Sequence, residues 1–205
     1  MFCFSSTDIE QVIKNSLKKS ILSTGNNKLK SSIFVSSVAE LLFNSYRDSR
    51  ENHSLRVIGY DEESGKRKSG ESLLDITIAK TKIITDPGNK QSSASISYQL
   101  IWAAESEANT SLPAFTADFG KLLCTKSTHY LYLNGLDQIK EESREAYMIR
   151  RLTIARQLLH EAGLEYNRFF YAFWPSPNKN HSKNKSFWDM HHKDDLLNMV
   201  RVFEL

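Results

Sequence analysis

The chain has few of the features that mark secreted or membrane proteins. It contains two cysteines, Cys3 and Cys124, which are too few for a disulfide framework and favour a reducing compartment. No segment approaches the roughly 18 continuous apolar residues of a membrane-spanning helix. The first residues lack the basic region and apolar run of a secretory signal. We therefore expect a cytoplasmic protein with no membrane partner.

The chain also lacks a strong excess of either charge. It has 27 Lys and Arg residues against 24 Asp and Glu residues, a net charge of +3. Such a mildly basic balance is compatible with a polyanionic partner but does not require one. The length of 205 residues and the 40% hydrophobic content suit one domain with a substantial core. We expect a single domain over residues 1–205.

Apolar periodicity predicts four helices. Thr7 and Glu10 have the spacing of a capping box and would open an N-terminal helix. Residues 23–32 are expected to form a loop. The other predicted helices span 33–47, Pro113 to about Cys124, and 141–162 before Gly163. The arginines of the long helix are expected mostly on its polar, solvated side: Arg144, Arg150, Arg151 and Arg156.

Five segments have the pattern of β-strands. They are residues 55–60, 72–80, 97–105, 128–135 and 167–175. In the second, Leu74, Ile76 and Ile78 are expected to face one way, and Asp75 and Thr77 the other. Residues 86–93 are dense in turn formers. Two helices, three strands and then alternating helices and strands predict a mixed α/β sheet covered by helices.

Carboxylates cluster where the third predicted strand ends. Glu105 and Glu107 follow an apolar run, and residues at i and i+2 of a strand share a face. Asp75, on the preceding strand, is expected to lie near Glu105. Two such carboxylates are a common way to hold Mg²⁺, which can activate water at a phosphodiester. From their spacing alone, Asp75 and Glu105 are more commonly solvated residues at the edge of a sheet than metal ligands.

The stretches "ESLLDITIAK", "QLIWAAESEANTS" and "ADFGKLL" resemble a divergent branch of the PD-(D/E)XK nuclease-like superfamily, which has the restriction-endonuclease-like fold. The core order of that fold, helix, three strands, helix, strand, matches residues 33–134. An added N-terminal helix would precede this core, and a C-terminal helix–strand extension would occupy about 136–205. The resemblance implies that Asp75 and Glu105 are metal-binding catalytic acids. It also implies Mg²⁺ or Mn²⁺ as cofactor and hydrolysis of nucleic acid, with DNA as the expected substrate.

The sequence departs from the family pattern at one position. The family usually has a lysine two residues after the second acid, and this chain has Glu107 there. Lys121, on the following helix, is the natural replacement, although an exposed pair with Asp118 would also explain it. Glu107 is either a further metal ligand or the mark of a member that has lost catalysis. In the second case the chain would be a nucleic-acid-binding or protein-interaction module. Glu40 is a conceivable extra ligand, with a surface position as the simpler expectation.

Two basic clusters could contact phosphates. They are Lys66, Arg67 and Lys68, and then Lys179, Lys183 and Lys185 in a loop without acids. Each cluster alone is equally explained by solvation. A homodimer is left open by the sequence.

Overall fold

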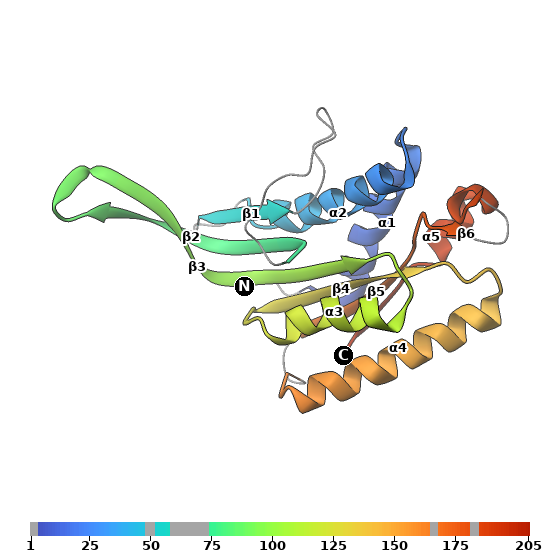
Figure 1. Ribbon diagram of the computed structural model, residues 1–205. Helices are drawn as coiled ribbons and strands as arrows, with labels where there is room; N and C mark the ends of the chain where they lie inside the picture. The colour runs from blue at the N-terminus through green and yellow to red at the C-terminus, as the bar shows by residue number, and fades with distance from the viewer. Residues whose placement is uncertain (1–3, 48–51, 58–73, 165–167, 181–184) are drawn as a thin grey trace.

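The protein is built on one six-stranded mixed sheet with helices on both faces (Figure 1). The computed structural model describes residues 4–47, 52–57, 74–164, 168–180 and 185–205. The helices are α1 (Ser6–Leu22), α2 (Asn27–Asn44), α3 (Leu112–Leu123), α4 (Glu141–Glu161), the 3-10 turn η1 (Trp188–Met190) and α5 (Lys193–Asn198). The predicted mixed α/β sheet covered by helices is confirmed.

The strands of the main sheet lie in the order β1-β2-β3-β4-β5-β8. They are β1 (His53–Val57), β2 (Ile76–Asp86), β3 (Asn89–Glu107), β4 (His129–Leu136), β5 (Arg168–Pro175) and β8 (Arg201–Glu204), and β6 (Lys179–Asn180) pairs separately with β7 (Lys185–Ser186). The first three strands are antiparallel neighbours, β3, β4 and β5 are parallel, and β8 is antiparallel to β5. Parallel neighbours need crossover connections, and α3 and α4 supply them.

Each face of the sheet has its own apolar core. Helices α1, α2 and α5 cover one face, where Ile13, Phe34 and Trp174 are fully buried. Helices α3 and α4 cover the other face over Phe119 and Phe169. Strands β4 and β5 are buried on both faces, which explains their almost continuous apolar sequence. None of the helices in the described part of the chain is both long and apolar enough to cross a membrane.

The N-terminal helices begin earlier than the sequence pattern indicated. The capping box of α1 is formed by Ser5 and Asp8, not by Thr7 and Glu10. Ser5 Oγ accepts the backbone N–H of Asp8, and the Asp8 carboxylate accepts that of Ser5 at 2.8 Å. Asn26 caps α2, so most of the predicted loop over 23–32 is helical. Both corrections reflect competing Ser, Thr and Asn caps close together in the sequence.

Strands β2 and β3 form a much longer hairpin than the sequence indicated. The predicted turn region over 86–93 lies inside the hairpin: Pro87 and Gly88 connect the strands, Asp86 pairs with Asn89 and Ser93 pairs with Thr85, with a register shift between these two pairs. Asp86 Oδ1 accepts the N–H of Gly88 at 2.7 Å and stabilises this turn. Beyond the neighbouring strands the hairpin extends alone as a two-stranded ribbon (Figure 1).

Two expectations about side-chain direction were wrong. Leu74 does not share a face with Ile76 and Ile78, because it precedes the strand and packs into the core beneath α3 and α4. Arg151 is not solvated on the outside of α4 but is only 7% exposed. Its guanidinium donates to the Thr110 carbonyl at 2.7 Å and lies over the Phe115 ring.

Candidate functional site

The candidate site lies where β3 ends, beside the start of β2. Glu105 and Glu107 are in the last three residues of β3. Ile76 pairs with Ala104, so the antiparallel register places Asp75, one residue before β2, opposite Glu105. Asp75 Oδ2 accepts the backbone N–H of Ser106 at 2.9 Å. This hydrogen bond holds the first acid against the strand that carries the second.

Helix α3 brings a cation to the same place. Ser111 caps this helix, Pro113 occupies its first turn, and Phe115, Phe119 and Leu122 are buried against the sheet. This burial fixes the rotation of the helix about its axis. As a result, the side chains of Asp118 and Lys121 lie near the end of β3. The two side chains are one turn apart, which is the spacing of neighbours on a helix surface.

Lys121 pairs with two carboxylates at once. Its Nζ lies 2.6 Å from Asp118 Oδ1 and 3.3 Å from Glu105 Oε2. The predicted local pair with Asp118 is therefore present, but the amine also reaches the second acid of the motif. Burial opposes protonation of the amine, but both carboxylates favour it, and the net effect raises the pKa of Lys121. Lys121 is thus a cation at neutral pH.

Glu105 is the most buried acid of this group. Its side chain is 1% exposed, and its Oε1 accepts no hydrogen bond from the described residues. Burial and the charge of Asp75 raise the pKa of Glu105 to about 8, although Lys121 partly offsets both effects. A buried carboxylate with a spare oxygen is costly unless a cation or proton satisfies it. This environment favours binding of a further positive charge.

Glu107 belongs to the same cluster through Asp118. Its Oε1 accepts the Asn109 N–H at 2.6 Å. Burial raises the pKa of Glu107, the Asn109 N–H partly offsets this effect, and the nearby Asp118 and Asp75 raise the pKa further. Asp118, which the sequence indicated only as a partner of Lys121, therefore links Glu107 to the lysine.

The donors suit a hard cation, but the structure alone does not form a complete cation-binding shell. Carboxylate oxygens are the ligands that Mg²⁺ prefers, and Asp75, just before β2, and Glu105, on the adjoining β3, supply them. Within the described residues, no group of three or more His, Cys, Asp or Glu side chains is arranged to hold a metal ion. Mg²⁺ commonly keeps several waters and takes only one or two carboxylates from the protein, so two donors are sufficient.

Tyr132 is a neighbour of the site that the sequence did not single out. It pairs with Glu105 across β3 and β4, and its side chain is fully buried. Its hydroxyl makes no hydrogen bond with the described residues. Burial raises the pKa of Tyr132, and the charges of Asp118 and Glu107 add to the effect. The only signal in the sequence was the alternation that places this tyrosine on the same face as Glu105.

Other predicted residues lie away from this cluster or outside the described part of the chain. Glu40 is an exposed residue of α2, on the opposite face of the sheet, where Lys19 lies 3.5 Å from its carboxylate. Lys185 is exposed in β7, and Lys179 belongs to β6, whose side chains are not described. The remaining predicted phosphate contacts lie outside the described residues: Lys66, Arg67, Lys68 and Lys183.

No family model, curated protein or solved structure matches the chain. The functional interpretation therefore depends on the geometry of the cluster and on the resemblance of its sequence motifs.

Proposed function

We propose that this protein is a metal-dependent nuclease that hydrolyses phosphodiester bonds in nucleic acid, with DNA as the substrate. The observation that carries the proposal is the meeting of Asp75, Glu105 and Lys121 at the end of β3, although they come from three separate elements. The proposed fold is the restriction-endonuclease-like one. Its core order is matched by α2, three antiparallel strands, α3 and the parallel strand β4.

Asp75 and Glu105 would hold Mg²⁺ or Mn²⁺ through their carboxylate oxygens. A bound divalent ion lowers the pKa of water and neutralises charge on a phosphodiester. Asp75 is already oriented by the Ser106 N–H, which donates to its Oδ2. Glu105 is oriented by Lys121, and its Oε1 is the oxygen that accepts no hydrogen bond from the described residues.

Lys121 would act as a fixed positive charge, not as a base. The adjacent carboxylates keep it protonated, so it can donate hydrogen bonds to an oxygen on which negative charge develops. With a side chain that is 41% exposed, it can reach a substrate as well as Glu105. Glu107 and Asp118 would serve as positioning residues, since Asp118 pairs with the lysine at 2.6 Å and its negative charge raises the pKa of the neighbouring Glu107.

The rival function is binding without catalysis, by a member of the same fold whose site has decayed. The observation that favours it is Lys121 itself, because its ion pairs with Glu105 and Asp118 already compensate part of the negative charge that would attract a metal. The rival predicts an intact fold and nucleic-acid binding, but no hydrolysis at any metal concentration.

Metal binding and cleavage can be measured on the same samples. We expect Mg²⁺ or Mn²⁺ to raise the melting temperature of the protein by mass action, and Glu105→Gln to abolish the rise. Glu40→Gln, which removes a carboxylate from the other face, is the control and should keep the rise. Incubation of the same proteins with duplex DNA then separates the two functions. Stabilisation together with Mg²⁺-dependent cleavage supports the nuclease, and binding without cleavage supports the rival.

A further inference from the structure

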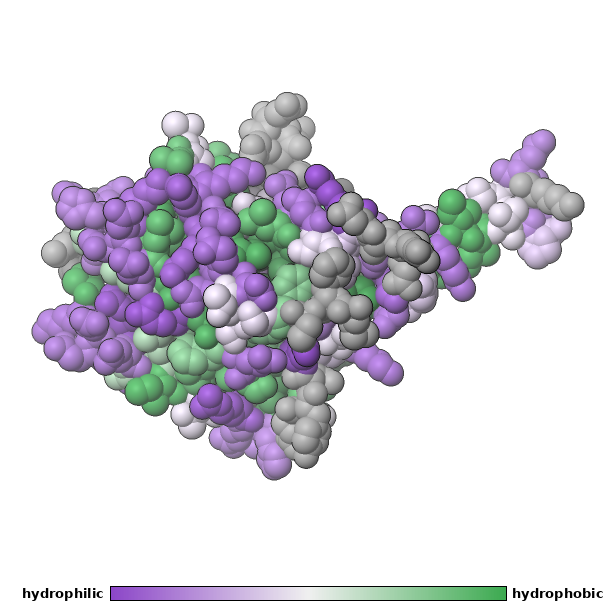
Figure 2. All heavy atoms as spheres, turned by 180° about the vertical axis from the view of Figure 1, so that it is seen from behind, coloured by the Kyte–Doolittle hydropathy of each residue, from purple (hydrophilic) through white to green (hydrophobic). Residues whose placement is uncertain are grey.

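The ribbon formed by residues 80–99 is the largest feature of the molecule that the proposed site does not use. Strand β1 pairs with β2 only as far as Lys80, and β4 pairs with β3 only from Trp102 onward. The Thr81 N–H still donates to the Asn52 carbonyl at 2.8 Å, and beyond it the two strands of the ribbon pair only with each other among the described residues. Figure 2 shows the ribbon extending clear of the body of the protein. A lone two-stranded hairpin is marginally stable in water, so its length is unexplained by the fold alone.

The composition of the ribbon favours a polyanion. Residues 80–99 contain three lysines and one acid, Asp86, whose carboxylate accepts the Gly88 N–H in the turn. Nine of the twenty residues are Ser, Thr, Asn or Gln, the side chains that hydrogen-bond phosphates and base edges. Lys82 Nζ lies 5.5 Å from the centre of the Tyr98 ring, and this cation–π contact holds its charge on one face of the ribbon.

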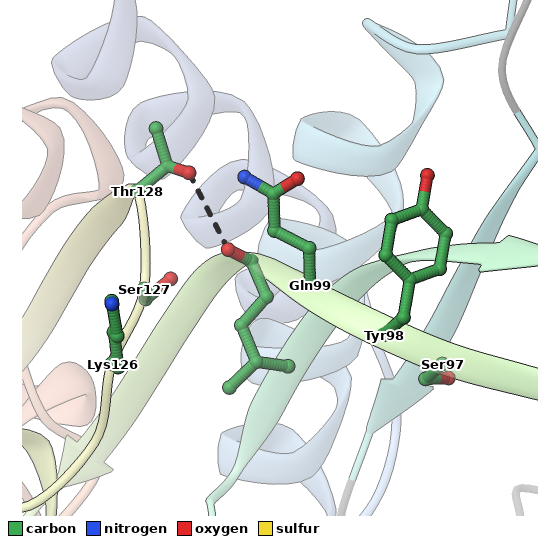
Figure 3. Close-up of a pocket in the computed structure, with 7 residues that line it drawn as sticks. Ser97, Tyr98, Gln99, Lys126, Ser127 and Thr128 are labelled. Carbon is green, nitrogen blue, oxygen red and sulfur yellow. Dashed lines mark hydrogen bonds between the residues drawn. The ribbon is translucent and has the colours of Figure 1, made fainter.

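A cleft lies at the base of the ribbon. It has a volume of about 650 Å³ and is lined by Ser97, Tyr98, Gln99, Leu100, Lys126, Ser127 and Thr128. Figure 3 shows Tyr98 and Gln99 rising from β3 and the loop before β4 facing them, with Thr128 bonded to the Leu100 carbonyl. The lining includes one cation and no acid, which suits a phosphate group.

The ribbon and the cleft together account for the basic character of the protein. Residues 80–99 and 126–128 carry four lysines and one aspartate, a net charge of +3, which equals the net charge of the whole chain. The remaining residues are therefore neutral as a group. Charge concentrated on a projecting element and its base directs a polyanion to that surface.

The apolar side chains of the ribbon form one small group beside a lysine. Ile84 stands opposite Ala94, and Ala94 and Ile96 alternate along β3, so these three side chains share one face of the ribbon. Lys82 stands opposite Ile96 on that same face, and its amine lies over the Tyr98 ring. Interfaces between protein chains have an apolar centre depleted of charge. The lysine within this small group therefore favours a polyanion over a protein partner.

The position of the ribbon relative to the candidate site fits a duplex. At about 3.3 Å per residue, Leu100 in the cleft lies about 16 Å along β3 from Glu105, and the tip of the ribbon lies up to about 50 Å away. This spacing corresponds to about five base-pair steps from the site to the cleft. The major groove of B-DNA is wide enough to admit a two-stranded β-ribbon.

We infer that the ribbon of residues 80–99 and the cleft at its base form a second contact surface for duplex DNA. The ribbon enters the major groove, and Lys82 and Lys126 contact phosphates. The inference rests on the proposed function for the identity of the partner, and it adds a surface remote from the catalytic cluster. It implies that binding needs a duplex long enough to reach from the cluster to the ribbon.

The test is binding of a labelled 25-base-pair duplex, measured by fluorescence anisotropy in EDTA, so that the result does not depend on cleavage. One variant replaces residues 83–95 with Asn-Gly, which joins the cross-strand partners Lys82 and Ile96 by a favoured two-residue turn. A second combines Lys82→Ala with Lys126→Ala. The control combines Lys14→Ala with Lys18→Ala and removes the same charge from α1.

We expect both ribbon variants to weaken binding about tenfold or more, and the double variant to flatten the log–log salt dependence by about two units. The control should bind as the unmodified protein does, and circular dichroism should show that all variants fold. Equal affinity and equal salt slope in the ribbon variants would overturn the inference, whatever the result of the cleavage assay. It would also be overturned if the unmodified protein bound no duplex or preferred duplex RNA. Dissociation of a dimer when the ribbon is shortened would assign the ribbon to a second copy instead.

Discussion

Lys121 places its amine 3.3 Å from Glu105 Oε2, although 16 residues and the turn from β3 into α3 separate the two in the chain. The contact exists because α3 runs back over the end of β3 and buries Phe119 and Leu122 beneath it. Glu105 and Asp118 then share one cation, and the negative charges of Asp75 and Asp118 raise the pKa of Glu105 and of Glu107. This arrangement leads to predictions that need no substrate, and to one that does.

The pKa of Glu105 predicts a specific pH dependence of stability. Since burial raises the folded pKa to about 8 from an ordinary value of 4.5, the protonated form stabilises the fold. This stability is fully present below about pH 4.5 and is lost as the pH rises through 8. Each unit of pKa difference between the folded and unfolded states is worth about 1.4 kcal/mol. Glu105→Gln should therefore reduce the fall in the free energy of unfolding between pH 5 and 8 by several kcal/mol. Urea unfolding of the unmodified protein and of Glu105→Gln, in EDTA, measures this free energy at each pH. Parallel pH profiles for the two proteins would refute the raised pKa of Glu105.

Asp118→Asn should lower the pKa of both neighbouring glutamates. The charge of Asp118 contributes to the raised pKa of Glu105 and of Glu107, so its removal makes each easier to ionise. Carbon-13 NMR of glutamate-labelled protein can follow both titrations. Asp86→Asn, in the distant turn of the ribbon, is the control. Unchanged titrations in Asp118→Asn would show that the carboxyl groups do not interact.

Gly135 and Gly120 provide a matched pair for backbone packing near the site. A Cβ at Gly135 would lie 2.6 Å from the Ala108 carbonyl oxygen and 2.9 Å from its Cα, whereas a Cβ at Gly120 would meet nothing within 4 Å. Gly135→Ala must therefore displace the backbone that follows Glu107, at a cost of about 1–3 kcal/mol. Gly120→Ala, inside α3, should stabilise by about 0.5–1 kcal/mol. Chemical denaturation should give opposite signs, and the same sign for both would contradict the close approach.

His129 should make the protein sensitive to acid. It is 3% exposed, and burial together with the charge of Arg168 lowers its pKa to about 4. A histidine kept neutral in the folded state stabilises the protein above pH 6.5 and loses that contribution as the pH falls through 4. His129→Phe, between the rings of Phe4 and Trp102, should reduce this loss in urea unfolding at pH 4.5 compared with pH 7. An identical acid profile in the variant would assign the loss to other groups.

The parts of the fold that the sequence predicted well are those in which local pattern and burial agree. Examples are the apolar strands β4 and β5 and the long helix α4, whose sequence patterns fit no other secondary structure as well. The predicted bounds of these three elements differ from the observed ones by one residue at most. The ribbon was missed because its Ser, Asn and Gly residues are also typical of loops. Its strand structure comes from pairing across the hairpin, which a local pattern does not contain.

In the candidate site, too, local sequence patterns do not contain the packing between distant segments. The acids could be selected from the sequence because Glu105 and Glu107 have the two-residue spacing of one strand face and the motif resemblance indicated Asp75, whereas the role of Lys121 depends on how α3 lies on the sheet. An exposed pair with Asp118 explained the lysine equally well until the helix was placed. Arg151 was assigned to solvent for the same reason, since only the packing of α4 shows that it points inward.

The most direct test is the single-turnover rate of duplex DNA cleavage in Mg²⁺ at saturating protein. We predict cleavage by the unmodified protein and by Glu40→Gln, and no detectable cleavage by Asp75→Asn. Lys121→Ala should fold normally and cleave about 10²–10⁴-fold more slowly, which is the scale of losing one electrostatic or proton-transfer contact. The account would be contradicted if the unmodified protein left DNA intact at every Mg²⁺ concentration, or if Asp75→Asn cleaved as fast as the unmodified protein.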